Sequence, residues 1–270
     1  MNTLRAGDEM RTETFTSKRE VMIRPDANGI AQTAAAEFVE AARKAAQEKG
    51  SFSVALAGGS TPKALYSLLA NNPLLQALVP WSKIQWFFGD ERHVYPDDAE
   101  SNFRMATEAL FSKVPVDAQQ VHRIKGEKAN AMEAAAEYDD DLRRSFRLEA
   151  DQLPRFDLVL LGMGAEGDTA SLFAGTKALK EEHRLVVSNW VGKLYSDRIT
   201  LTPPVLNNAA RVVFMVHGQE KALTLKAVLE GPYEPEQLPA QLIYPKQGRV
   251  MWLADPSAAA MLAPNGKRTQ

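Results

Sequence analysis

The chain has 270 residues, of which 45% are hydrophobic and 24% charged, proportions typical of a globular protein with a sizeable core. Its 32 lysines and arginines nearly balance 34 aspartates and glutamates, so no strong field attracts nucleic acid or an anionic membrane. Cysteine is absent, which excludes disulfides, thiolate metal sites and cysteine nucleophiles. With no signal peptide or membrane-spanning run in the sequence, we expect a cytoplasmic protein.

The chain begins with a polar stretch, residues 1–12, which we expect to be flexible. Apolar residues at helical spacing then predict a helix over 28–49, with Gly50 as its stop. The short apolar run at 52–57 has the length of a buried strand. In the segment that follows, Thr61 can cap a helix and Pro62 suits its first position.

The same strand–helix unit recurs along the rest of the chain. In chain order the pattern predicts a strand at 83–88, helices at 103–111 and 128–146, strands at 156–162 and 210–216, a helix at 222–231, a strand at 248–254 and a last short helix at 256–262. This alternation predicts a doubly wound α/β fold, with a mostly parallel sheet and helices on both faces. No linker or repeat interrupts it, so we expect residues 13–270 to form a single domain.

Four loops that are rich in glycine or charge directly follow predicted strands. They read AGGST at 57–61, GDER at 89–92, GMGAEGD at 162–168 and HGQEK at 217–221. In an open parallel sheet, ligands bind outside the carboxyl ends of the strands. We therefore expect these four loops to meet along one edge and to form the functional site.

The first of these loops offers groups that can bind a phosphate. Its glycines are also compatible with a simple tight turn, but backbone N–H groups and hydroxyls that open a helix suit an anion, and four residues supply them: Gly58, Gly59, Ser60 and Thr61. Lys221 is either a solvated lysine or a second charge on the same anion. Arg198 is either a surface strand residue or a forked contact to phosphate oxygens.

The second loop concentrates three charges, Asp90, Glu91 and Arg92, at the end of a strand. They either form a functional cluster or an internal salt bridge that fixes the loop. Ser101 and Asn102 are natural caps for the next helix. Of the four histidines only His93 is assigned to one of these loops, in the charged stretch that continues after Arg92, while His217 is taken to end a strand. We expect the other three to be packed or solvent-facing: His122, His183 and His217. The sequence has no HExxH, GxSxG or Walker motif, which weakens the zinc-protease, serine-hydrolase and NTPase interpretations.

Several motifs together resemble those of one family. They are ALAGGSTPKALYSLLA, WFFGDERHVYPDDAESNFRMA, LVLLGMGAEGDTASLFAGT and RITLTPPVLNNAARVVFMVHGQEKALTLKAVLEG, with the later LPAQLI. In order and spacing the chain resembles 6-phosphogluconolactonases, relatives of glucosamine-6-phosphate deaminases that share their doubly wound fold. The resemblance implies hydrolysis of 6-phospho-D-glucono-1,5-lactone to 6-phosphogluconate, in the oxidative pentose phosphate pathway, with no redox cofactor and no metal.

The resemblance also implies roles for particular residues. The phosphate pocket would consist of Gly58, Gly59, Ser60 and Thr61, with Lys221 and Arg198. Asp90 and Arg92 would line the sugar end of the site. The implied ligand is a small sugar-phosphate lactone, with neither nucleic acid nor membrane as a partner, and the implied assembly is a monomer or a small homo-oligomer.

At the third loop the chain departs from the family, whose usual pattern DGHTASLF supplies a histidine as general base. Here that position is Asp168, preceded by Glu166 where the family usually has Asp. An ordinary aspartate is a weaker base than histidine, but burial or nearby carboxylates can raise its pKa. Asp168 is therefore predicted to be a substitute base, with Glu166 and Asp90 as the other carboxylates of the catalytic cluster.

Other interpretations stay open. Asp168 can instead cap a helix while Asp90, Glu166 or His93 acts as the base. The protein can also be a sugar-phosphate-binding module with little catalysis. A deaminase is a further alternative, but deaminases typically show DEY and a GHIAFNEP-like stretch where this chain has DER and GDTASLF, which favours the lactonase.

Overall fold

The computed structural model describes residues 19–263, so the expectation about residues 1–12 lies outside it. At its centre is a six-stranded sheet in the order β1-β9-β8-β5-β2-β3, and all of its neighbouring strands run parallel. The strands are β1 (Arg19–Ile23), β2 (Phe52–Leu56), β3 (Ile84–Phe88), β5 (Leu158–Gly162), β8 (Arg211–Val216) and β9 (Arg249–Ala254). The predicted doubly wound parallel sheet is confirmed.

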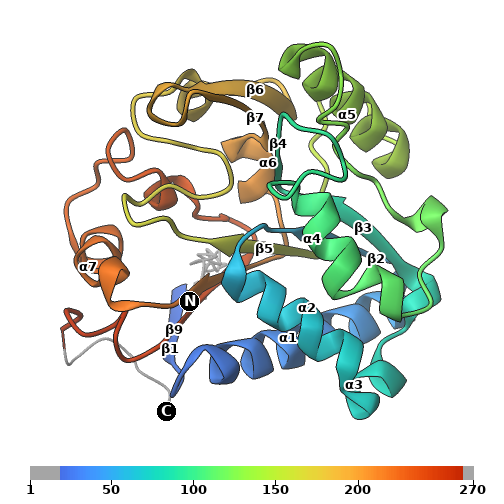
Figure 1. The fold of residues 1–270 in the computed structure, drawn as a ribbon, viewed down its shortest axis with the longest axis horizontal. Coiled ribbons are helices and arrows are strands. Elements are labelled where there is room, and N and C mark those ends of the chain that lie inside the picture. The colour runs from blue at the N-terminus through green and yellow to red at the C-terminus, as the bar shows by residue number, and fades with distance from the viewer. Residues whose placement is uncertain (1–18, 264–270) are drawn as a thin grey trace, which may run out of the picture.

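Two layers cover this sheet (Figure 1). On one side lie α1 (Ala27–Lys49), α2 (Ser60–Asn71) and α3 (Pro73–Leu78). The other side carries α5 (Ala131–Phe146), α6 (Pro203–Asn207) and a small antiparallel sheet of β4 (Asp90–Arg92), β7 (Ser196–Leu201) and β6 (Val186–Val191). The remaining longer helices are α4 (Asn102–Ala109) and α7 (Ala222–Glu230). Within residues 19–263, no helix has both the length and the apolar character needed to cross a membrane.

The order of the strands fixes where a ligand can enter. From β2 the chain moves outward to β3, and it then returns to place β5 on the opposite side of β2. The connections that leave β2 and β5 therefore diverge, which opens a crevice at their carboxyl ends. This switch point lies between the loop that begins at Ala57 and the loop that begins at Met163.

The helix and strand boundaries follow local chemistry. The side chain of Asp26 accepts a hydrogen bond from the Gly29 N–H at 2.8 Å and caps α1, and Gly50 ends that helix with φ 78°. Strand β2 is buried at every residue, as expected for a strand covered on both faces. Phe38 of α1 stacks on Trp86 of β3 with ring centroids 5.7 Å apart, which fixes the helix against the sheet.

Some expectations about the elements were wrong. The α2 helix begins at Ser60 with Gly59 as its N-cap, so Thr61 is not the cap and Pro62 is not at its first position, because Gly59 adopts φ 102° and starts the helix earlier. Residues 256–261 form turns instead of a helix, because a single i→i+4 hydrogen bond, from the Ala259 N–H to the Asp255 backbone oxygen, is followed by i→i+3 bonds such as that from the Leu262 N–H to the Ala259 oxygen. Strand β1 and the antiparallel sheet were not predicted.

Candidate functional site

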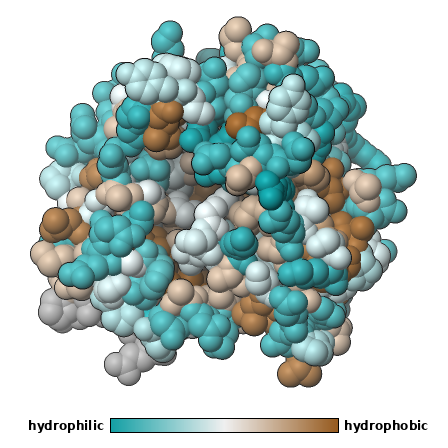
Figure 2. Space-filling model, in the orientation of Figure 1, coloured by the Kyte–Doolittle hydropathy of each residue, from teal (hydrophilic) through white to brown (hydrophobic). Residues whose placement is uncertain are grey.

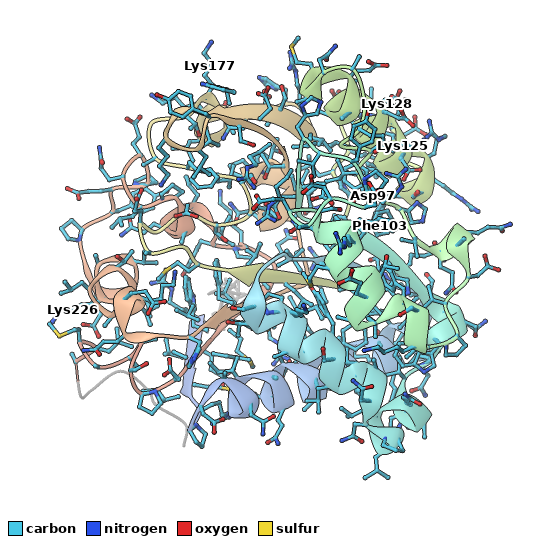
Figure 3. The ribbon with its side chains drawn as sticks, viewed as in Figure 1. Asp97, Phe103, Lys125, Lys128, Lys177 and Lys226 are labelled. Carbon is cyan, nitrogen blue, oxygen red and sulfur yellow. The ribbon has the colours of Figure 1, made fainter. Side chains whose placement is uncertain are left out.

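The carboxyl ends of β2, β5 and β8 open into one cleft of about 330 Å³, so three of the four loops selected from the sequence meet there, joined by Asp90 and Arg92 of the fourth. A larger groove of about 640 Å³ lies between α4 and α5, close to Phe103 and Lys125 in Figure 3. Its charged side chains are largely paired with each other, as Lys125 is with Glu137. The smaller cleft is therefore the better candidate for an active site, because its polar groups converge and are not mutually neutralised.

One end of the cleft can receive an anion. Within residues 19–263, no side chain caps the N-terminus of α2, which leaves the N–H groups of its first turn for a ligand at the positive end of the helix dipole. Gly59, with φ 102°, has a conformation that other residues rarely adopt. Lys221, from the loop after β8, lines the same cleft, and its Nζ is 4.0 Å from the nearest oxygen of Glu220. Helix terminus and lysine thus face one space.

The Asp90 carboxylate is held at both of its oxygens. Asn102 Nδ2 donates to Oδ1 of Asp90 at 3.2 Å and to its backbone oxygen at 2.9 Å, and Ser171 Oγ donates to Oδ2 at 2.7 Å. Asn102 in turn packs against Gly58, where a Cβ would lie 2.0 Å from Asn102 Oδ1. Gly58 is therefore needed for the position of Asn102, and through Asn102 for the orientation of Asp90.

Glu91 has a structural role. It is almost fully buried, and its carboxylate accepts hydrogen bonds from the N–H groups of Arg92, Asn102 and Phe103 at 2.8, 2.8 and 2.9 Å. Burial raises the pKa of Glu91, although these N–H groups act in the opposite direction. Together with the predicted Ser101 cap, Glu91 holds the start of α4. Between residues 19 and 263, neither Asp90 nor Glu91 forms a salt bridge with Arg92.

The structure does not bring Arg198 into the cleft. Arg198 lies on β7 opposite Arg92 of β4, and it is only 8% exposed. Burial, and then the neighbouring Arg92, lower the pKa of Arg198. Arg92 itself lines the cleft, and it donates a hydrogen bond to the Glu100 backbone oxygen. A direct contact between Arg198 and a phosphate therefore has no support in this arrangement.

Asp168 lines the cleft at the end of a tight loop. The Gly164 N–H donates to the Asp168 backbone oxygen at 2.8 Å, and the Gly167 N–H donates to the Gly164 oxygen at 3.1 Å. The Asp168 carboxylate then lies over Gly164, where a Cβ would be 2.1 and 2.2 Å from its two oxygens. Burial raises the pKa of Asp168, while the charges of Lys193 and Lys221 oppose that shift.

The structure does not support the alternative interpretations in which Asp168 caps a helix or in which Glu166 or His93 acts as the base. Asp168 is not a helix cap, because Thr169 and Leu172 form a short bridge after it and no helix begins there. Glu166 is exposed, pairs with Lys193 and does not line the cleft. His93 Nε2 lies 2.9 Å from the Lys128 backbone oxygen, also outside the cleft. Of the proposed bases, only Asp168 and Asp90 face the cleft.

One residue of the site was missed. His217, expected to be packed or solvent-facing, lines the cleft directly after β8, with Nδ1 3.4 Å from Oδ2 of Asp255. The rule that selected Lys221, its place in a loop at the carboxyl end of a strand, also applied to His217. Its position as the first residue of HGQEK was the available signal.

Fold and site together define a doubly wound α/β protein with a polar cleft at its switch point, in which carboxylates face a helix N-terminus and a lysine. The family model for glucosamine-6-phosphate isomerases/6-phosphogluconolactonase matches residues 25–252. The chain belongs to this family.

Individual relatives agree with this assignment. The chain is 41% identical over 222 residues to a 6-phosphogluconolactonase from Synechocystis, covering 82% of this chain and 89% of that protein. A solved 6-phosphogluconolactonase from Trypanosoma cruzi is 30% identical, with a TM-score of 0.80 over 93% of this chain and 99% of that one. A monomeric glucosamine-6-phosphate deaminase has a TM-score of 0.74 over 90% of this chain and 99% of that one, but its 20% identity shows a shared fold alone.

Proposed function

We propose that the chain is a 6-phosphogluconolactonase, which hydrolyses 6-phospho-D-glucono-1,5-lactone to 6-phosphogluconate. The observation that carries the proposal is the cleft itself, in which the Asp168 and Asp90 carboxylates share one space with the α2 N-terminus and Lys221. An anion-binding end next to carboxylates suits a substrate that carries a phosphate at one end and a hydrolysable carbonyl at the other. The similarity to proteins named 6-phosphogluconolactonase supports the same activity.

In this proposal the phosphate binds to the first turn of α2, through Ser60 and Thr61, and to Lys221. Gly58, which packs against Asn102, and Gly59, with φ 102°, form the turn that brings the first N–H groups of α2 to the cleft. Because two separate elements hold the phosphate, the sugar is oriented towards the ends of β3 and β5. Orientation of this kind contributes much of the rate enhancement when the reaction itself is easy.

At the lactone end, Asp168 accepts a proton from a water molecule as its oxygen attacks the carbonyl carbon. Collapse of the tetrahedral intermediate breaks the bond to the ring oxygen, and the proton on Asp168 passes to that oxygen. Arg92 lines this end, and its guanidinium can donate N–H groups to the negative charge that develops on the carbonyl oxygen. Asp90, held by Asn102 and Ser171, orients the sugar through its hydroxyl groups.

The test is the initial rate of 6-phosphogluconolactone hydrolysis, measured above its spontaneous background from acid to mildly alkaline pH. We expect turnover well above background. Ammonia release from glucosamine 6-phosphate without lactone hydrolysis would favour the deaminase. Tight binding of 6-phosphogluconate with no acceleration would favour a binding module. Residence in the cytoplasm, a single domain over 13–270, and a monomer or small homo-oligomer stay predictions.

A further inference from the structure

His217 is fixed at the end of the cleft where β8 meets β9. Its side chain is 44% exposed, and it lines the cleft in the same loop as Lys221. Nδ1 faces the buried Asp255, which follows β9, at 3.4 Å. No protein group within residues 19–263 makes a hydrogen bond to Nε2, so that nitrogen is available to a ligand. The ring thus has one occupied side and one open side.

Asp255 presents a fixed negative charge to this ring. Its Oδ1 accepts the N–H groups of Gly218 and Ala258 at 3.0 and 3.2 Å, and Ser257 Oγ donates to Oδ2. Burial opposes ionisation, but these hydrogen bonds prevail and lower the pKa of Asp255. The carboxylate also closes the turn that places His217. It therefore both orients the imidazole and attracts its protonated form.

The charge balance of the cleft shows why a further cation matters there. Among residues 19–263, three carboxylates line it, those of Asp90, Asp168 and Glu220, against two permanent cations, Arg92 and Lys221. The cleft thus has one excess negative charge before a phosphate dianion enters. A dianion that enters the cleft is attracted by Lys221 and the α2 N-terminus but repelled by these carboxylates, so a further positive group would strengthen its binding.

We propose that His217 is a second cation for the phosphate, protonated when the dianion binds because the imidazole then lies between phosphate and Asp255. The ligand class is a phosphomonoester of a sugar acid or its lactone, and in this respect the inference rests on the proposed function. The charged groups around the ring are Asp255 behind it, Glu220 and Lys221 on the next turn, and Asp168 across the cleft. Binding of the phosphate is consequently coupled to uptake of a proton by His217.

The experiment is titration calorimetry with 6-phosphogluconate in two buffers that differ in ionisation enthalpy, between pH 7 and pH 9. This range lies above the second pKa of a phosphomonoester, about 6, so the ligand itself releases at most about a tenth of a proton at pH 7 and less at higher pH. His217→Asn and His217→Gln are compared with the parent and with His183→Asn, a control at an exposed histidine outside the cleft. Melting curves without ligand check that each variant is folded.

For the parent and His183→Asn we expect proton uptake on binding, with affinity that falls by about tenfold towards pH 9, the size of one charge-assisted hydrogen bond. Both His217 variants should bind about tenfold more weakly at pH 7, take up no proton and show little pH dependence. If they instead match the parent in affinity and proton uptake, the inference is overturned.

The two proposals fail separately. If the parent hydrolyses the lactone and the His217 variants bind 6-phosphogluconate as the parent does, the role of His217 is refuted and the proposed lactonase activity stands. His217-dependent, proton-coupled binding without lactone hydrolysis supports the cation and refutes the lactonase. A parent that binds neither 6-phosphogluconate nor inorganic phosphate refutes both.

Discussion

Replacement of Asp168 by asparagine tests the proposed base with little change in shape. Asparagine has nearly the same size as aspartate, so it can keep the position over Gly164 where the carboxylate now lies. What the variant loses is the ability to accept a proton. Its effect on turnover therefore measures chemistry rather than packing.

The expected loss follows from the step proposed for Asp168. A positioned general base contributes about 10²- to 10⁴-fold, or about 3–5 kcal/mol of activation free energy. We expect kcat for the lactone to fall within that range in Asp168→Asn while the binding of 6-phosphogluconate is retained, because the phosphate end is not altered. Asp151→Asn, at an exposed aspartate outside the cleft, is the matched control and should keep the parent rate.

The pH dependence has a definite sign. Burial raises the pKa of Asp168 above its ordinary value near 3.9, and a base must be ionised to act. The parent's kcat/KM should therefore fall as the pH drops through this raised pKa, at a higher pH than for an unperturbed aspartate. The folded state also binds this proton more tightly than the unfolded state, so the contribution of Asp168 to stability falls as the pH rises through the same window.

A second measurement follows from this coupling between the protonation of Asp168 and the stability of the fold. Asp168→Asn should melt at a higher temperature than the parent at pH 7–8, where the buried carboxylate is charged, and the difference should vanish near pH 4 or below. If Asp168→Asn hydrolyses the lactone at the parent rate, after the spontaneous reaction is subtracted, the assignment of Asp168 as the base is refuted. Asp168→His, which restores the residue of the family pattern, should be active and should show its acidic limb nearer the histidine range, about 6.5.

Three other substitutions test the supporting geometry. Gly164→Ala places a methyl group against the Asp168 oxygens. Because the carboxylate is flexible and can move away, the fold should be kept. The kcat should fall at least tenfold in the same lactone assay, because Asp168 is displaced. Glu91→Gln puts an amide N–H₂ among the buried donors at the start of α4 and should cost about 1–3 kcal/mol in urea unfolding; unchanged stability would contradict its structural role. Lys221→Met should raise KM for the phosphorylated lactone about tenfold with a smaller change in kcat, and should leave an unphosphorylated gluconolactone unaffected.

Much of the fold was predictable because it depends on short-range patterns. The continuous apolar runs at 52–57, 156–162 and 210–216 predict buried strands, and the loops after them must meet at one edge of a parallel sheet. The antiparallel sheet was not predictable in the same way. Strand β4 is only three residues long, and its pairing with β7 joins segments about a hundred residues apart in the chain.

The candidate site also contains some residues that the sequence places correctly and others that it does not. The residues 58–61, Asp90, Arg92, Asp168 and Lys221 were found because they lie where strands end. Arg198 was selected for its residue type and through the family resemblance, and Glu166 because it lies two residues before Asp168. In the structure Arg198 is buried on β7 and Glu166 faces solvent. The distinction depends on the direction of a side chain, and a linear pattern does not encode that direction across two sheets.

Asp168, which stands where the family usually has histidine, and His217 affect each other through the net charge of the cleft. A histidine base can be neutral or positive, whereas Asp168 adds a negative charge to a cleft that has to hold a phosphate dianion. Two unit charges that lie close together in a partly buried site interact by roughly several kcal/mol. The negative charge of Asp168 therefore weakens phosphate binding unless another group compensates for it. His217, backed by the ionised Asp255, is able to do so, because it becomes positive when the phosphate arrives. A protein with aspartate at the base position is then expected to depend on His217 for phosphate affinity, and Asp168→His should reduce that dependence.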